Sequence, residues 1–469
     1  MENLETIFQN RFGIVNPNER KIGPEIEGIL FSPKTPNNIP SVEEISELFE
    51  NIASGLNGAA DLYNERIQIN GETTYAYSTK VKFEVNDYFV EITTGISRCT
   101  FEMTVPPSRS LSENERNLKY IFEKLLKGAE NSRLEILGLG AHPFAEHSNE
   151  SIMPKLINVY LSERLDGNEL KRLITNASSQ FHVELSRNET ESLPNMLMRF
   201  IPPIVALTCN SAIIEGEFSG YKEYRSYALE REKDHHMEES RAGLPPNFFS
   251  ADNNYFRYLI SHSPIISRRR DMINGFYITF DDKAKTFSDF INKGTTEARR
   301  TDSGNKITVT PELVDLVFLE GTVWPEVRLR STFGTAEFRP CSFQPSADEI
   351  LAIGAVVKGL VNNYIEASRL VEKYDIKTIR EAHRSAMRYG PDAHIGGESL
   401  LELSKRMLYV AARGLDGNEK QFLRPMEKNA ESGKSPADRS IAYFTELLKR
   451  QPRNSDFTQN FVEKHRFKI

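Results

Sequence analysis

The 469-residue sequence has few cysteines, a single tryptophan and no long apolar run. Its three cysteines are odd in number and widely spaced: Cys99, Cys209 and Cys341. This usage argues against a disulfide framework and for packed free thiols in a reducing compartment. The sequence contains no C-x-x-C pair, the spacing that would indicate a zinc site. No apolar stretch approaches the roughly 20 residues that span a bilayer.

The sequence also lacks a secretory signal and an excess of positive charge. Residues 1–5 (MENLE) have neither the basic start nor the apolar core of a signal peptide. A net charge of −7 gives no bias towards polyanions, and we expect the cluster Arg268–Arg270 to be a solvated helix end. We therefore expect a cytoplasmic protein, monomer or homodimer, without nucleic-acid or membrane partners.

What is present is the composition of a globular protein, with 39% hydrophobic and 27% charged residues. Strand-like and helix-like patterns alternate from residue 21 to residue 345. We expect strands at 23–31, 75–93, 99–105, 179–187, 325–331 and 335–342, and helices at 41–56, 111–129 and 190–208. From residue 346 onward the pattern is purely helical. The prediction is an α+β body (1–345) on which a helical region (346–469) packs.

Helix starts are marked by capping residues. Ser41 and Glu44 have the spacing of a capping box. Ser346 stands before an acidic first turn and a run of apolar residues at helical spacing.

The expected strands carry charge on one face. Side chains of a strand alternate between faces, so Glu25 and Glu27 share a face opposite Ile26. Glu102 likewise lies opposite Phe101 and Met103. The same alternation recurs in residues 180–185 (QFHVEL), 326–330 (EVRLR) and 336–339 (AEFR).

A water-facing sheet surface also alternates in this way, and this remains one interpretation. Solvated faces, however, usually carry Lys, Thr and Ser, whereas these strands carry glutamate pairs, His, Gln and Arg. Mg²⁺ prefers oxygen ligands, and arginine binds carboxylate and phosphate in a bidentate manner. The alternative interpretation is therefore a metal-dependent site for phosphoryl chemistry.

Several segments resemble the glutamate–cysteine ligase family of the plant and proteobacterial type. They keep the family's order and cover residues 21 to about 440. They are residues 22–27 (IGPEIE), 101–106 (FEMTVP), 138–143 (GLGAHP), 153–155 (MPK), 178–185 (SSQFHVEL), 206–211 (ALTCNS), 224–226 (YRS), 241–245 (RAGLP), 286–290 (TFSDF), 324–329 (WPEVRL), 337–339 (EFR) and 433–438 (GKSPAD).

The resemblance implies a glutamine-synthetase-like fold, in which a curved, mostly antiparallel sheet forms a funnel flanked by helices. In the family, ATP phosphorylates the γ-carboxylate of glutamate, and the amine of cysteine attacks the acyl phosphate. The implied cofactor is Mg²⁺, with ATP as co-substrate, and the product is the first intermediate of glutathione synthesis.

The resemblance also assigns roles residue by residue. Four carboxylates match positions that hold Mg²⁺: Glu25, Glu27, Glu102 and Glu337. Gln180 matches a position on the metal or nucleotide side. His182 shares its face and replaces a family Asn, so it is either a further ligand or a hydrogen-bonded structural group.

Four arginines receive expected roles. Arg225 and Arg339 match arginines near the transferring phosphate or the glutamate carboxylate, with an inter-strand salt bridge as the alternative. Arg328 either has a structural role or contacts a substrate carboxylate. Arg241 either closes over the nucleotide or lies on a loop surface.

The chain departs from the family pattern before Phe101, where the family has a carboxylate. Glu91 is a loose substitute, so one metal ligand is in doubt. The pair His235–His236 is expected in a solvated loop. These departures leave three functions open, namely glutamate–cysteine ligase, a ligase for another amine, and a non-catalytic binding module of the same fold.

Overall fold

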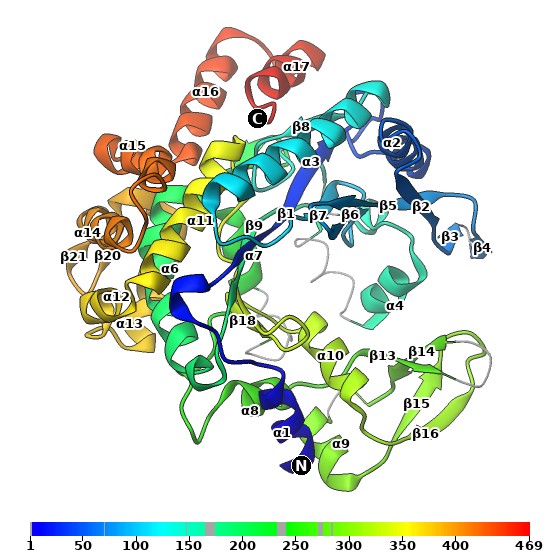
Figure 1. Ribbon diagram of the computed structural model, residues 1–469. Coiled ribbons are helices and arrows are strands. Elements are labelled where there is room, and N and C mark those ends of the chain that lie inside the picture. Colours follow the sequence, from blue (N-terminus) through cyan, green and yellow to red (C-terminus); the bar gives the residue numbers. More distant parts are fainter. Residues whose placement is uncertain are drawn as a thin grey trace.

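Two large β-sheets, four two-stranded pairs and a thick layer of helices build the described part of the protein (Figure 1). The computed structural model describes residues 2–69, 71–146, 148–164, 174–231, 241–270, 275–282 and 285–469. The expected α+β class is confirmed, with a mostly antiparallel main sheet.

The main sheet has nine strands, in the order β18-β19-β9-β1-β7-β6-β5-β2, with β8 also paired to β1. Every pairing in it is antiparallel. The strands are β1 (Ile22–Phe31), β2 (Ala60–Asn64), β5 (Ser78–Val85), β6 (Tyr88–Thr94), β7 (Thr100–Thr104), β8 (Glu135–Leu137), β9 (Ser179–Glu184), β18 (Val327–Arg330) and β19 (Thr335–Phe338).

The expected strand at 75–93 is two strands joined by a tight turn. Asn86 and Asp87 separate β5 from β6 with φ values of 51° and 62°. Asn and Asp adopt this left-handed conformation at lower cost than other side-chain-bearing residues, which makes them turn formers in hairpins.

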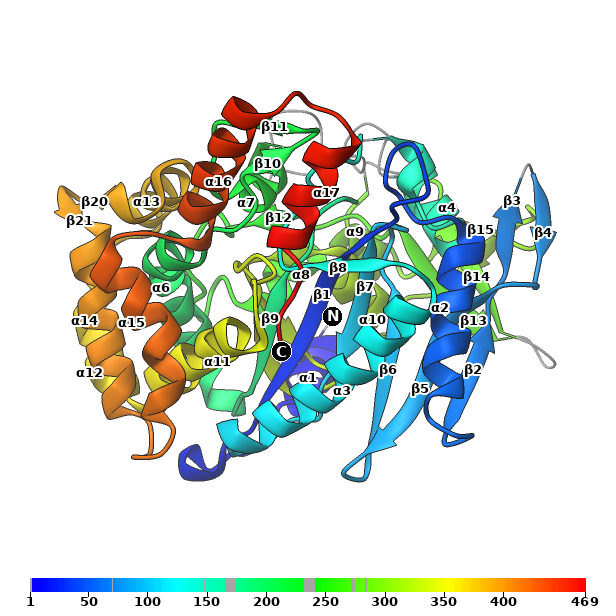
Figure 2. The same ribbon diagram turned by 90° about the horizontal axis from the view of Figure 1, so that it is seen from above.

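Helices cover the outer face of the main sheet, as Figure 2 shows for α2 and α3. The main ones are α2 (Val42–Ser54), α3 (Leu111–Asn131), α6 (Ser192–Thr208) and α11 (Ala347–Asn362). The capping box of Ser41 and Glu44 is confirmed, and Ser346 caps α11. One continuous hydrophobic core runs from Phe8 to Phe467 through sheet and helices.

The chain after residue 346 is mainly helical, as expected. It contains α11, α12 (Tyr364–Val371), α13 (Ile376–Tyr389), α14 (Leu400–Arg413), α15 (Arg424–Ser432), α16 (Pro436–Arg450) and α17 (Ser455–Lys464). A short hairpin, β20 (His394–Ile395) with β21 (Glu398–Ser399), interrupts the predicted purely helical pattern. Gly396 and Gly397 have positive φ and allow this turn. The division of the chain at residue 345 stays a prediction.

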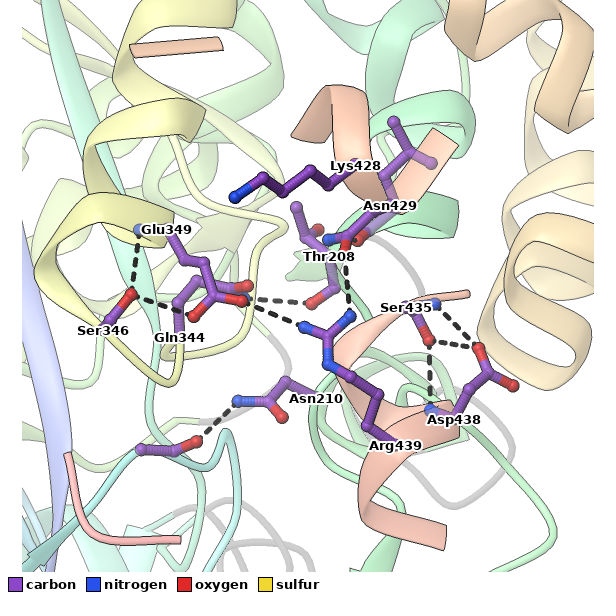
Figure 3. A network of polar contacts seen from close by, with 12 residues as sticks. Thr208, Asn210, Gln344, Ser346, Glu349, Lys428, Asn429, Ser435, Asp438 and Arg439 are labelled. Atoms are coloured by element: carbon purple, nitrogen blue, oxygen red, sulfur yellow. Dashed lines mark hydrogen bonds and ion pairs between the residues drawn. The ribbon is translucent and has the colours of Figure 1, made fainter. Parts of the chain in front are cut away.

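Polar contacts attach the last helices to the body (Figure 3). The Arg439 guanidinium of α16 donates to Glu349 of α11 at 3.0 Å and to Asn429 of α15 at 2.8 Å. Ser435 and Asp438 form a capping box at the start of α16. The segment 433–438 therefore has a local structural role, because it ends α15 and begins α16.

No single helix in the described ranges is long and apolar enough to cross a membrane. Among the helices that the structure describes, α11 and α12 together have the length and composition, but they bend by 96°. Most of α11 is buried inside the protein.

The second sheet was not predicted. It has four antiparallel strands, β13 (Ile266–Arg270), β14 (Gly275–Phe280), β15 (Thr296–Arg300) and β16 (Lys306–Val309). The expectation of a solvated helix end at Arg268–Arg270 is wrong, because these residues alternate along β13. Arg269 points inward and bonds both oxygens of Asp315, at 2.6 and 2.7 Å, on α10 (Leu313–Thr322).

The remaining described elements are short or peripheral. They are α1 (Glu2–Asn10), α4 (Leu156–Arg164), α7 (Tyr224–Arg231), α8 (Tyr255–Ile260), α9 (Phe287–Lys293), and the strand pairs β3 (Ile67–Ile69) with β4 (Glu72–Thr74), β10 (Ile213–Ile214) with β11 (Glu217–Phe218), and β12 (Ala242–Gly243) with β17 (Trp324–Pro325).

Close packing of α11 on β9 predicts a large effect of one methyl group. A Cβ at Gly354 would lie 2.6 Å from the fully buried ring of Phe181. We expect Gly354→Ala to lower the melting temperature by several degrees, because overpacking costs about 1–3 kcal/mol. Gly321, inside α10, has no atom within 4 Å of such a Cβ. Gly321→Ala is the matched control and should keep or raise the melting temperature, measured by calorimetry. Equal melting temperatures for the two variants would contradict the packing argument.

Candidate functional site

A cavity of about 1190 Å³ lies between the inner face of the main sheet and the second sheet. Its walls include side chains of β1, β6, β7 and β18 on one side and of β13, β14 and α4 on the other. Six of the predicted site residues line it: Glu25, Glu27, Glu102, Arg225, Arg328 and Arg339.

The register of the strands brings the carboxylates together. Glu27 on β1 lies directly opposite Glu102 on β7, and Glu25 opposite Gln180 on β9. Ile26 and Met103 are opposite each other and fully buried on the helix-covered face. The predicted alternation therefore separates the acidic inner face from the apolar outer face.

Three residues form a group at the wall of the cavity, and one of them, Glu25, lines it. Ligand atoms of Glu25, His182 and Glu337 all lie within 4.8 Å of one another. His182 Nε2 is 2.8 Å from Glu25 Oε2, and its Nδ1 is 3.0 Å from Thr335 Oγ1. His182 and Glu337 contact lining residues and are themselves mostly or fully buried.

Two arginines hold Glu337 in its ionised form. Arg328 donates to both of its oxygens, at 2.8 and 2.9 Å. Arg339 donates to Glu337 and to the buried Gln180. Burial would raise the pKa of Glu337, but the charges of Arg328 and Arg339 hold it well below its ordinary value.

The negative charges of the other carboxylates in the site are compensated by their neighbours to different degrees. Burial and the charges of Glu25 and Glu27 raise the pKa of Glu102 to about 8, although Lys155 and Arg339 act against this rise. Burial would also raise the pKa of Glu25, but the hydrogen bond from His182 keeps it below its ordinary value. Glu27 accepts a hydrogen bond from Ser178 at 2.5 Å. A cation entering between Glu25, Glu27 and Glu102 would relieve their repulsion.

This donor set fits a divalent cation. Glu25, Glu27 and Glu102 present oxygen atoms to the cavity, and Glu25, His182 and Glu337 converge on one point. Each oxygen of Glu337 retains a further lone pair beside its bond to Arg328. Arg328 can therefore orient Glu337 as a ligand.

Of the two remaining arginines, Arg225 lines the cavity and Arg241 does not. Arg225, on α7, is 4% exposed and lines the cavity. Arg241 is not among the lining residues, because its buried guanidinium donates to the backbone carbonyls of Thr322, at 2.8 Å, and Ser263, at 2.6 Å. These bonds favour a structural role for Arg241, and the expectation of a loop-surface position is wrong.

Sequence reasoning gave no site role to several charged lining residues, among them Lys155, Glu326 and Arg330. Glu326, Arg328 and Arg330 occupy every second position of the same segment. Their side chains are therefore expected on one face, and this alternation could have predicted that Glu326 and Arg330 line the cavity. Lys155 lies in the loop before α4, where its ammonium donates to Thr93 Oγ1 at 3.0 Å and to the carbonyl of Thr94 at 3.1 Å. No periodic pattern marks a loop residue.

The remaining residues that the sequence singled out are Glu91, the three cysteines and the pair His235–His236. Glu91 lies on β6, lines the cavity and is 3.3 Å from Lys80. The cysteines are free and buried, as expected. His235–His236 lies outside the described residues.

Comparisons with known proteins agree with this geometry. The family described as Glutamate-cysteine ligase family 2 (GCS2) matches residues 21–459. A relative from Chloroflexus aurantiacus, provisionally named glutamate–cysteine ligase 2, is 24% identical over 312 residues, 65% of this chain and 63% of the relative. A Roseiflexus relative with the same provisional name is 24% identical over 363 residues, 74% of this chain and 78% of the relative. The match thus spans less than two thirds of the Chloroflexus protein.

The fold is similar to that of a solved structure, glutamate–cysteine ligase from Francisella tularensis in complex with AMP. The TM-score is 0.54 at 11% identity, covering 97% of this chain and 90% of the other. At this identity the likeness establishes the fold alone. Because the family match extends over nearly the whole chain, the protein belongs to glutamate–cysteine ligase family 2.

Proposed function

We propose that the protein is an ATP- and Mg²⁺-dependent ligase that joins the γ-carboxylate of glutamate to the amine of cysteine, the first step of glutathione synthesis. The observation that carries the proposal is the convergence of Glu25, Glu27 and Glu102 with Arg328 and Arg339 on one cavity. Carboxylates for metal ions and guanidinium groups for phosphates are what phosphoryl transfer requires.

Two chemical steps account for the product. The γ-carboxylate oxygen attacks the γ-phosphorus of ATP, which gives γ-glutamyl phosphate and ADP. The amine nitrogen then attacks the acyl carbon, phosphate leaves, and the nitrogen loses a proton to form the amide.

The proposed roles follow from position. Mg²⁺ bound to Glu25, Glu27, Glu102 and Glu337, with or without His182, would neutralise phosphate charge. Arg339 would bind the transferring phosphate, and the bonds that its guanidinium donates to Glu337 and Gln180 support this role by fixing its position at the cavity wall. Its fixed position avoids reorganisation during the reaction. Arg328 orients Glu337.

A different amine acceptor is the second candidate. The wall opposite the carboxylates includes Tyr160, Tyr277 and Trp324. These aromatic side chains offer an apolar surface that a side chain larger than that of cysteine would fill. The buried, unpaired cysteines fit a reducing compartment, and we propose a cytoplasmic location.

Product formation with a panel of amines tests the function. With ATP, Mg²⁺ and glutamate, phosphate release should depend on cysteine. Glu337→Gln or Glu27→Gln should lower turnover by roughly 100-fold or more, since each removes a charge used for metal binding. Glu419, which pairs with Lys358 at 2.6 Å outside the cavity, supplies the control Glu419→Gln. Release that depends on another amine would select the second candidate, and near-normal turnover of Glu337→Gln would remove the metal assignment.

Arg339→Lys tests the role of the guanidinium. Lysine cannot contact Glu337, Gln180 and a phosphate with one planar group. We expect single-turnover formation of ADP to slow by roughly 100-fold. Arg269 lies outside the cavity, and its side chain is 9% exposed against 12% for Arg339. Arg269→Lys should lower the melting temperature without slowing this step. An unchanged single-turnover rate for Arg339→Lys would leave Arg339 a structural residue.

Removal of Mg²⁺ should make stability depend on pH through Glu102. A freely exposed glutamate titrates near pH 4.5, and Glu102 in the folded protein near pH 8. Because the folded pKa is raised, the stabilisation is complete below pH 4.5 and is lost as the pH rises through 8. The metal-free melting temperature should therefore fall between pH 6 and pH 9, and Mg²⁺ should stabilise more at pH 9. Glu102→Gln should flatten the metal-free slope, and an identical slope would contradict the assignment.

A further inference from the structure

A buried glutamate lies behind the cavity wall. Glu223 is 1% exposed, directly precedes α7 and is not among the described residues that line the cavity. Burial raises the pKa of its carboxyl group, and the hydrogen bond from Ser342 and the charge of Arg225 act against this rise. A carboxylate in such a place is costly to the folded protein unless its neighbours compensate it. Its contacts therefore indicate what it does.

Three hydrogen-bond donors from two other segments converge on the carboxylate of Glu223. The backbone amide of Asn210 donates to Oε2 at 3.2 Å, and the hydroxyl of Ser211 donates to Oε1 at 3.1 Å. The hydroxyl of Ser342 also donates to Oε1. None of these three residues is more than 2% exposed. Glu223 thus joins the segment after α6 to the segment after β19.

The cluster continues to the backbone of Arg225, the second residue of α7. Amides in the first turn of a helix have no acceptor within the helix. Ser211 supplies one, because its hydroxyl oxygen accepts from the Arg225 amide at 3.1 Å while its proton goes to Glu223. A carboxylate only accepts hydrogen bonds, so it sets the direction of the Ser211 hydroxyl and leaves the lone pairs of that oxygen for Arg225.

The backbone contact matters because the side chain of Arg225 is less restrained at its tip. Its Nη1 atom is buried and has no hydrogen-bond partner among the described residues. Arg339, by contrast, is held at its tip by Glu337 and Gln180. The place of the Arg225 guanidinium in the cavity wall therefore depends on where the first turn of α7 lies.

The same cluster fixes this first turn to the segment that carries Arg339. Ser342 lies three residues after Arg339 and bonds Glu223. Ser226, the neighbour of Arg225, donates to the carbonyl of Pro340 at 3.4 Å. The two arginines of the cavity wall are thus connected behind the wall through one carboxylate.

We propose that Glu223 is a positioning residue for Arg225. Through Ser211 and Ser342 it fixes α7 to the segment of Arg339, and so keeps the Arg225 guanidinium in its place in the cavity wall. This inference rests on the proposed function, in which arginines of the wall face anionic groups of the substrates. A misplacement of about 1 Å in a group that orients a substrate costs on the order of 100-fold in rate.

A double-mutant cycle tests whether Glu223 acts through Arg225. The value of kcat/KM for glutamate is measured on the full chain, with ATP, Mg²⁺ and the best amine acceptor, for the two single variants and the double variant. Glutamine offers one oxygen to the three donors, so Glu223→Gln should lower kcat/KM by roughly tenfold or more. In the Arg225→Gln background the same change should have an effect of less than about twofold, because the residue through which it acts is already lost.

Ser211→Ala is a second variant, which keeps the test valid should Glu223→Gln not fold. It removes the acceptor of the Arg225 amide and leaves the bonds of Glu223 to Asn210 and Ser342. It should lower kcat/KM as well, again only while Arg225 is present. Amide hydrogen exchange in peptides that cover α7 should be roughly fivefold faster in both variants, as the loss of one hydrogen bond predicts. This readout does not require turnover.

Glu44 supplies the matched control. It is also a buried glutamate that accepts from a hydroxyl and a backbone amide, those of Ser32 and Ser41, each at 2.9 Å. It lies on α2, outside the cavity. Glu44→Gln should lower the melting temperature, because it weakens a helix cap, and should leave kcat/KM and the exchange of α7 unchanged.

The outcomes separate this inference from the ligase assignment. A full effect of Glu223→Gln in the Arg225→Gln background would show two independent contributions and overturn the positioning role. Normal kcat/KM in Glu223→Gln, or unchanged exchange of α7 in Ser211→Ala, would overturn it too, and the ligase function would stand in each case. A wild-type protein that joins glutamate to no amine would overturn both.

Discussion

The bidentate ion pair of Arg328 with Glu337 allows a cavity rich in carboxylates to exist before any ligand enters. Both side chains are almost fully buried, and Glu337 alone would be an uncompensated charge. Farther along the sheet, Glu102 has no comparable ion pair among the described residues, and burial with the charges of Glu25 and Glu27 raises its pKa to about 8. The negative charge of Glu337, on β19, is therefore present before any ligand binds. The charge of Glu102, on β7, would form when a bound cation compensates it.

The same strands that carry these charges also build the core. Ile26, Met103 and Phe181 point away from the cavity and pack under helices, so the positions of the charged side chains are set by packing on the opposite face. The close approach of Gly354 to Phe181 brings α11 directly onto β9. The second sheet completes the enclosure, and its own stability depends on the buried pair of Arg269 and Asp315.

Alternation made much of the site predictable. Glu25, Glu27 and Glu102 follow from strands whose apolar residues occupy every second position. The same alternation was recognised in residues 326–330, but no site role was given to Glu326. Lys155 has no periodic signal, since it lies in a loop, and the family-like segment 153–155 was the one sequence feature that included it. The burial of Arg241 was not predictable, because its partners, Ser263 and Thr322, are distant in sequence. The basic strand β13 resembled a helix end because consecutive arginines conceal which side chain is buried.

The order of strands has a consequence for how the protein acquires its structure. β1 lies between β7 and β9, and β9 pairs in turn with β19, whose residues follow more than 150 positions later. Closing such long loops costs entropy before any contact compensates it, which slows folding. Glu25 meets Glu337 only after this last pairing, so the two halves of the inner face form late and together. An intermediate that lacks β18 and β19 would expose the edge of β9, an unpaired template on which chains can associate wrongly.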